Sequence, residues 1–217
     1  MGFKAAIFDM DGTLLDSMGI WSNLCDEFLK KHGITKKIDL ENKLEVLSIR
    51  NALAYVLKVY PQLEIDLDTA WVQTWQIVEE FYCRRAEIKP GIPAILTRLK
   101  EQNIPAGIIT ATEEELVLKA LERVGLREYF AGNIISCATR NTSKRTPEVF
   151  LTMAEMFGST PEETIVFEDA LYAATTAKNA GFAVAAVFDP SEKHPQELAA
   201  VADWYCRSWE ELPLNIL

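Results

Sequence analysis

The spacing of apolar positions changes along the chain. Residues 4–8 form a short apolar run, which predicts a strand buried on both faces within a parallel sheet. From residue 17 to about residue 85, apolar residues recur at helical spacing, and Gly33 and Pro61 end two of the predicted helices. No convincing strand is predicted there, so this stretch is expected to be a helical insert.

Strict alternation of strands and helices follows the break at Lys89-Pro90-Gly91. This order predicts an α/β fold with a doubly wound, Rossmann-like parallel sheet and helices on both faces. Ligands bind at the carboxyl ends of the strands in such sheets. The strands are expected at 106–110, 133–136, 164–167, 183–187 and 203–206, and the helices at 92–102, 113–124, after Pro147, at 170–180 and at 210–212.

Composition and charge narrow the possible functions. The chain has 217 residues, 49% of them hydrophobic and 25% charged, which is ordinary for a globular protein with a real core. A formal net charge of −10 argues against binding to nucleic acid or to an anionic membrane surface. It does not exclude a phosphorylated substrate, because a bound metal and one or two lysines can make the electrostatic potential at the site positive. No apolar run is long enough to span a bilayer.

The cysteines and the first residues predict a cytoplasmic protein. Four widely spaced cysteines form no CxxC pair, so free thiols are expected rather than disulfides or a zinc site. Asp9 and Asp11 interrupt the segment that would have to be apolar in a signal peptide. The cysteines are Cys25, Cys83, Cys137 and Cys206.

Two carboxylates end the first predicted strand. Asp9 and Asp11 alternate along an extended chain and therefore lie on the same side of it. Like charges held this close repel, which favours a cation between them, and Mg²⁺ prefers oxygen ligands of this kind. The alternative is a buried strand that simply ends in an Asp-Gly turn.

Polar residues also end the later strands. Thr110, followed by Ala111, either donates its hydroxyl to a phosphate oxygen or caps a helix. Lys144 lies in a polar loop, 139–146, that is either functional or simply solvated. Glu168-Asp169 either supplies metal oxygens or starts the next helix. Because all these positions fall at strand carboxyl ends, they are expected to converge on one site.

Four segments carry a family resemblance. They are Phe8-Asp9-Met10-Asp11-Gly12-Thr13-Leu14, Ile109-Thr110, Lys144 within Ser143-Lys144-Arg145-Thr146-Pro147-Glu148, and Phe167-Glu168-Asp169-Ala170. In this order they resemble the four motifs of the haloacid dehalogenase-like hydrolase superfamily, over nearly the whole chain. The subgroup that the chain resembles contains helical-cap phosphatases and β-phosphoglucomutases. The resemblance implies a catalytic core of residues 1–16 and 88–217, with an α-helical cap domain inserted at 17–87.

The resemblance also implies a mechanism. Asp9 would attack phosphorus to form an aspartyl-phosphate, and Asp11 would act as general acid and base. Mg²⁺ would be held by Asp9, the backbone carbonyl of Asp11, and Asp169, with Glu168 a direct or water-mediated ligand. The acid at Asp11 argues against a haloacid or phosphonate substrate, since the dehalogenases and phosphonatases resemble one another in lacking it.

The phosphate would be bound by Thr110, Ala111 and Lys144. The substrate is expected to be a small phosphorylated metabolite, most plausibly a sugar or polyol phosphate, and the protein a monomer or weak dimer. The chain departs from the usual motifs in two places. Arg145 and Glu148 are unusual in the third motif, and Ala170 and Ala173 replace the common Ser and Gly of the fourth. None of these positions carries a charge that the chemistry requires.

Two other functions stay open. A phosphomutase of the β-phosphoglucomutase type would resemble its relatives in having a cap histidine, and the corresponding place here is Trp21. A binding protein without catalysis would not need the full set of acids and lysine. Four cap residues are conceivable contacts to the leaving group: Trp21, Asn23, Arg50 and Asn51. The simpler interpretation is that Trp21 packs between cap helices and that Arg50 lies on a solvated helix face.

Overall fold

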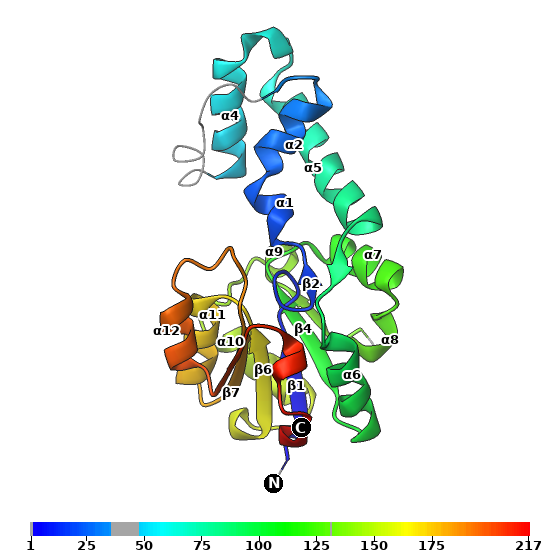
Figure 1. The fold of residues 1–217 in the computed structure, drawn as a ribbon, viewed down its shortest axis with the longest axis vertical. Helices are drawn as coiled ribbons and strands as arrows, with labels where there is room; N and C mark the ends of the chain where they lie inside the picture. The colour runs from blue at the N-terminus through cyan, green and yellow to red at the C-terminus, as the bar shows by residue number, and fades with distance from the viewer. Residues whose placement is uncertain (1, 36–47, 131) are drawn as a thin grey trace. The chain divides into compact units, whose positions relative to one another are not determined.

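The computed structural model describes residues 2–35, 48–130 and 132–217, so residues 36–47 of the predicted cap lie outside the described residues. The chain divides into two compact units. The first, here called the core unit, comprises Met1–Met18 and Ala86–Leu217, and the second, the helical unit, comprises Gly19–Arg85 (Figure 1).

The core unit is built on a six-stranded parallel sheet with the order β5-β4-β1-β6-β7-β8. The chain starts in the middle of the sheet, and later strands are added on both sides of β1, which confirms the predicted doubly wound α/β class. The strands are β1 (Ala5–Phe8), β4 (Ala106–Thr110), β5 (Ile134–Ser136), β6 (Thr164–Glu168), β7 (Ala183–Val187) and β8 (Trp204–Cys206).

Apolar side chains alternate between the two covered faces of this sheet. On one face Ile7 and Val166 join a buried cluster with residues of α10, α11 and α12. On the other face the rings of Phe8 and Phe167 stack with centroids 4.2 Å apart, and Trp209 packs edge-on against Phe167. The helices of the core unit are α6 (Ile92–Glu101), α7 (Glu114–Val124), α8 (Arg127–Phe130), α9 (Cys137–Arg140), α10 (Glu148–Met156), α11 (Leu171–Asn179) and α12 (Pro195–Val201).

A short antiparallel pair joins the two linkers that enter and leave the helical unit. β2 (Leu15–Asp16) pairs with β3 (Glu87–Ile88), and the next backbone N–H, that of Lys89, donates to the carbonyl of Leu14 at 2.9 Å. Two-residue strands leave no periodic signal, so this pair could not be predicted from the pattern of apolar residues. The core unit includes residues 17, 18, 86 and 87, which lie at the two ends of the predicted cap, 17–87.

Helices account for the described part of the helical unit. They are α1 (Met18–Ser22, which begins in the last residue of the core segment), α2 (Leu24–Lys31), α4 (Ile49–Val59) and α5 (Leu67–Arg84). Trp21 donates its indole N–H to the Tyr82 hydroxyl at 3.2 Å and packs edge-on against Trp75. Arg50 donates to Asp68 at 2.5 Å and lies over the Trp71 ring. Trp21 and Arg50 therefore both have partners within this unit.

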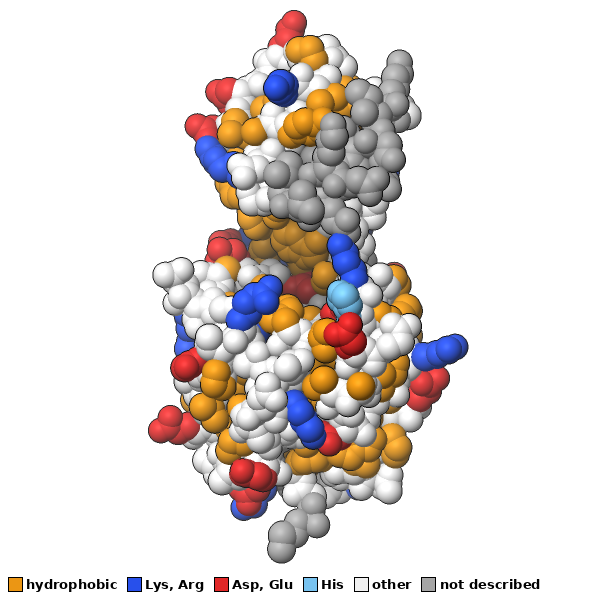
Figure 2. All heavy atoms as spheres, turned by 90° about the vertical axis from the view of Figure 1, so that its left-hand side faces the viewer, with side chains coloured by type: hydrophobic (Ala, Val, Ile, Leu, Met, Phe, Trp, Pro, Cys, Tyr) orange, Lys and Arg blue, Asp and Glu red, His pale blue; other side chains and the backbone are white. Residues whose placement is uncertain are grey.

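The charged side chains on the surface of the core unit are mixed with apolar ones. Figure 2 shows acidic and basic side chains dispersed among apolar ones on the face of the core unit that it presents. Among the residues that the structure describes, no helix is both long enough and apolar enough to cross a membrane.

Candidate active site

Three carboxylates meet at the carboxyl ends of β1 and β6. One oxygen from each of Asp9, Glu168 and Asp169 lies within 4.8 Å of the other two, and all three side chains are buried. The backbone N–H of Asp9 donates to the carbonyl of Phe167 at 2.9 Å, which continues the pairing of the two central strands up to the acids. The parallel register of β1 and β6 thus brings together residues that are far apart in the sequence.

Lys144 reaches this cluster from the loop between α9 and α10. Its ammonium donates to Oδ1 of Asp9 at 2.6 Å and to Oε1 of Glu168. Burial alone would lower the pKa of Lys144, but the charges of Asp9 and Glu168 outweigh it and raise the pKa well above its usual value. Both carboxylates therefore favour the charged form of Lys144. The side chain is 4% exposed, so the alternative of a simply solvated loop does not hold for this residue.

The cluster holds more negative than positive charge. Burial raises the pKa of Asp9 to about 7, with Lys144 opposing this shift and Glu168 adding to it. Burial and the charges of Asp9 and Glu168 also raise the pKa of Asp169 well above its usual value. One buried ammonium faces three buried carboxylates, so an excess of negative charge remains when all are ionised.

This donor set fits a divalent metal ion. Hard cations prefer carboxylate oxygens, and the excess negative charge is what such an ion would neutralise. Glu168 is already engaged on both oxygens, since Oε1 accepts from Lys144 and Oε2 accepts from the backbone N–H groups of Asp169 and Ala170 at 3.0 Å. Asp9 and Asp169 are therefore the carboxylates better placed to bind a metal directly.

The loop after β1 wraps around Asp169. The Thr13 hydroxyl donates to Oδ1 of Asp169 at 3.0 Å, and the carbonyl of Thr13 accepts the indole N–H of Trp209 at 2.8 Å. Trp209 is almost completely buried, and it lies in a 3-10 turn near the end of the chain. A contact between the first and last segments of the core unit therefore fixes the loop that faces Asp169.

Asp11 is held by hydroxyl groups. Ser17 and Thr112 each donate to one of its carboxylate oxygens at 2.6 Å, and the Thr110 hydroxyl lies 3.5 Å from Oδ2. The Asp11 side chain is partly exposed, unlike that of Asp9. These neutral hydroxyl donors hold the Asp11 carboxylate in one orientation.

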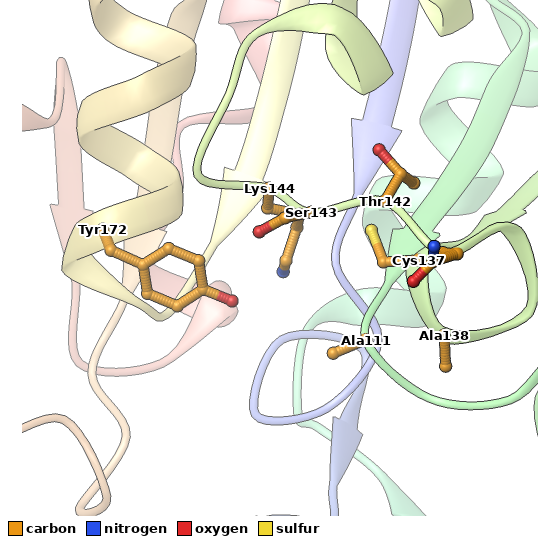
Figure 3. A pocket seen from close by; sticks show the side chains of 8 residues that line it. Ala111, Cys137, Ala138, Thr142, Ser143, Lys144 and Tyr172 are labelled. Atoms are coloured by element: carbon orange, nitrogen blue, oxygen red, sulfur yellow. The ribbon is translucent and has the colours of Figure 1, made fainter.

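A cavity of about 280 Å³ lies beside Lys144 (Figure 3). It opens between the loop after β4, the loop that carries Lys144, and the first turn of α11, where the Tyr172 ring points toward it. Of the predicted phosphate-binding residues, Ala111 and Lys144 line it, whereas the buried Thr110 hydroxyl instead accepts from the N–H of Thr112 at 3.0 Å. The lining residues are Ala111, Cys137, Ala138, Asn141, Thr142, Ser143, Lys144 and Tyr172.

Sequence reasoning missed several residues of this site. Ser17, Thr112 and Thr13 were not singled out. Thr112 lies two positions after the predicted strand 106–110, but hydroxyl residues are common next to strands and caps, so this signal is weak. Thr13 and Ser17 flank β2, which is too short to leave a periodic signal. Trp209 gave no local signal, because its partner lies at the other end of the chain.

Comparison with known proteins identifies the family. The family model described as haloacid dehalogenase-like hydrolase matches residues 6–187, which is most of the chain and includes all four predicted motifs. The chain belongs to the haloacid dehalogenase-like hydrolases. The predicted family membership is therefore confirmed.

The chain is also similar, at low sequence identity, to individual proteins that are named as phosphatases or as a candidate phosphoglucomutase. It is 25% identical over 178 residues to the phosphorylated carbohydrates phosphatase of Thermotoga maritima, covering 82% of each chain. It is 26% identical over 196 residues to hexitol phosphatase A of Escherichia coli, covering 88% of this chain and 86% of that one. A crystal structure of a candidate β-phosphoglucomutase from Thermotoga maritima superposes with a TM-score of 0.82 at 24% identity, over 98% of this chain and 97% of that one. The last comparison shows the shared fold.

Proposed function

We propose that this haloacid dehalogenase-like hydrolase is a Mg²⁺-dependent phosphatase that cleaves a small phosphate monoester through an aspartyl-phosphate. The observation that carries the proposal is the arrangement around Asp9. Its carboxylate is salt-bridged to Lys144 on one oxygen and shares an acidic cluster with Glu168 and Asp169, while the carboxylate of Asp11 accepts hydrogen bonds from the hydroxyls of Ser17 and Thr112. This separates a nucleophile from a proton-transfer group.

Asp9 is assigned as the nucleophile. A carboxylate attacks phosphorus only when it is ionised, and Lys144 favours that form by a direct salt bridge. Transfer of a phosphoryl group depends mainly on positioning and charge stabilisation, and Lys144 is the buried cation that lines the adjacent cavity. Asp9, Asp169 and the backbone carbonyl of Asp11 would hold Mg²⁺, with Glu168 behind them. When bound, the metal supplies further neutralisation of phosphoryl charge.

Asp11 is assigned as general acid and base. Its carboxyl group would protonate the leaving alcohol and then take a proton from the water that hydrolyses the aspartyl-phosphate. Ser17 and Thr112 would keep the carboxyl group in one orientation during both transfers. The cavity-lining backbone at Ala111 would contribute to phosphate binding.

The substrate class is proposed from the relatives. Two of them are named as phosphatases of phosphorylated carbohydrates and of hexitols, which supports a sugar or polyol phosphate for this chain. The helical unit corresponds to the cap domain that the family resemblance implies, and it would select the leaving group of the substrate. A phosphomutase is the alternative, and the similarity to a candidate β-phosphoglucomutase gives it no additional support because that similarity is one of fold.

The test is a Mg²⁺-dependent assay on p-nitrophenyl phosphate, followed by a panel of sugar and polyol phosphates with product analysis. Release of inorganic phosphate without an isomerised sugar phosphate is expected. Isomerisation without net release would contradict the proposal in favour of a mutase. Binding of phosphorylated ligands with no turnover across the panel would contradict it in favour of a binding protein.

A further inference from the structure

We propose that the Tyr172 hydroxyl donates a hydrogen bond to the phosphoryl group of the substrate, from the side of the cavity opposite Ala111. The inference rests on the proposed function. It adds a substrate-binding residue that lies outside the four motif segments and that sequence reasoning did not single out.

The position of Tyr172 supports this role. It is the second residue of α11, three residues after Asp169, and its ring lies at the cavity beside Lys144. In Figure 3 its hydroxyl points into the cavity between Lys144 and Ala111. The residue is 38% exposed, so a phosphate entering from solvent can reach its side chain.

The hydroxyl is available as a donor. Within the part of the chain that the structure describes, no hydrogen bond to the Tyr172 hydroxyl is formed. Burial raises the pKa of Tyr172, with Lys144 opposing the shift and Glu168 and Asp9 adding to it. The hydroxyl therefore keeps its proton at neutral pH. Lys144 is already shared between two carboxylates, so a second donor on this side of the cavity adds an interaction that the phosphoryl group would otherwise lack.

Arg145 holds the ring in this position. Its guanidinium carbon lies 4.6 Å from the centroid of the Tyr172 ring, a cation–π contact, and it directly follows Lys144 in the chain. The contact favours this position of the ring and brings a second positive charge next to a residue that lines the cavity. Arg145 is exposed, so this charge is accessible to an incoming phosphate dianion.

The same features also suit a simpler role. If Tyr172 only shields the stem of Arg145, its ring matters and its hydroxyl does not. The two roles are separated by Tyr172→Phe, which keeps the ring and removes the donor. Tyr129→Phe is a matched control, because the Tyr129 ring is also paired with a cation, Lys100 at 5.4 Å, but does not line the cavity.

The experiment measures inorganic phosphate binding in Mg²⁺ by calorimetry, together with hydrolysis of p-nitrophenyl phosphate, for the wild type and both variants. A hydrogen bond to a charged group predicts that Tyr172→Phe raises the dissociation constant of phosphate about 10-fold or more, and lowers kcat/KM by a similar factor through KM. Tyr129→Phe should leave both unchanged. Equal melting temperatures would show that all three proteins are folded.

Three results would overturn the inference. They are unchanged phosphate binding in Tyr172→Phe, an equal loss in Tyr129→Phe, and no phosphate binding by the wild type. The binding measurement does not require turnover. Phosphate binding that depends on the Tyr172 hydroxyl in a protein that hydrolyses no ester would therefore support the inference while the proposed function fails.

Discussion

Gly12 leaves the space that the Asp169 carboxylate occupies. A β-carbon at position 12 would lie 2.1 Å from Oδ2 of Asp169, and the backbone of Gly12 has a φ of +88°. Glycine is required here both for the left-handed backbone and for the close approach of the acid. The turn after Asp11 therefore determines where the carboxylate of Asp169, a proposed metal ligand, can lie.

Replacing Gly12 with alanine should displace Asp169. We expect Gly12→Ala to weaken Mg²⁺ binding at least 10-fold, because the added methyl group occupies the place of the carboxylate. The left-handed backbone adds about 1–2 kcal/mol of destabilisation. Magnesium titration by calorimetry and thermal unfolding measure the two effects.

Gly125→Ala separates the two causes. Gly125 has a φ of +72° with no atom within 4 Å of an added β-carbon. The Gly125→Ala variant should lose about the same 1–2 kcal/mol of unfolding free energy from its left-handed backbone and keep its affinity for Mg²⁺. Equal Mg²⁺ affinity in Gly12→Ala and the wild type would show that Asp169 is not a ligand.

The acidic cluster should make the metal-free protein less stable. Burial raises the pKa of Asp9 to about 7, so the folded state binds a proton that the unfolded state releases near pH 4. The contribution of Asp9 to stability therefore falls as pH rises from about 4 to 7. We expect metal-free Asp9→Asn to melt at a higher temperature than the wild type at pH 8, with the difference shrinking toward pH 5.

Mg²⁺ should reverse that difference. Saturating Mg²⁺ at about 100 times its dissociation constant should stabilise the wild type by about 2.7 kcal/mol. It should stabilise Asp169→Asn far less, because that variant lacks a metal-binding carboxylate. A wild-type melting temperature that does not respond to Mg²⁺ would refute the metal site.

Asp11 should affect the rate and not the fold. We expect Asp11→Asn to lower kcat by about 10²–10⁴-fold, the usual value of general acid–base catalysis. Thr112→Val, which removes one of the hydroxyls that orient Asp11, should lower kcat by a smaller factor and leave the melting temperature nearly unchanged. Steady-state kinetics of both variants would test this. A kcat for Asp11→Asn within threefold of the wild type would count against the assignment.

Lys89, which follows β3, and Asp189, which follows β7, form a buried ion pair. Lys89 donates to Oδ2 of Asp189 at 2.8 Å, and Asp189 is 2% exposed. Burial alone would raise the pKa of Asp189, but hydrogen bonds from Lys89 and from the Ser191 N–H lower it below its usual value. The stability that this carboxylate contributes is therefore present above its unfolded-state pKa, and it is lost as pH falls through the lower folded-state pKa.

Removing this charge should cost stability at neutral pH. We expect Asp189→Asn to lose about 3 kcal/mol of unfolding free energy at pH 7, because it leaves the Lys89 ammonium buried without its counter-charge. The loss should shrink below about pH 4. Denaturant unfolding at several pH values measures it. Glu115→Gln, which breaks the exposed pair with Lys119, should change little, and an equal effect would argue against a special role for the buried pair.

Local patterns in the sequence accounted for the sheet and for the charged residues at its edge. The predicted strands at 4–8, 106–110 and 164–167 correspond to β1, β4 and β6, which are buried along their whole length, as their mainly apolar character indicated. Asp9 and Asp169 could be placed together because parallel strands end at the same edge of a sheet. The short helices α8, α9 and α12 were missed, because four to seven residues give too little periodicity to detect.

What could not be predicted depends on contacts between distant segments. Trp209 meets the Thr13 carbonyl across 196 positions of sequence, and neither residue has a neighbour that indicates the other. The orientation of side chains was equally hidden. The contacts of the Thr110 hydroxyl, which accepts from the Thr112 N–H and lies 3.5 Å from Oδ2 of Asp11, had no signal in the sequence, and its predicted contact with phosphate stays a prediction. Side-chain direction at a strand end is set by the packing around it, which a pattern of residues does not contain.

In the proposed mechanism Asp9 attacks phosphorus. This step is tested most directly by mass spectrometry of peptides from enzyme quenched with acid during turnover of p-nitrophenyl phosphate in Mg²⁺. The predicted result is a phosphoryl group on the peptide that contains Asp9, and neither phosphorylation nor turnover in Asp9→Asn. A phosphoryl group on another residue, or turnover of Asp9→Asn at the wild-type rate, would contradict the claim.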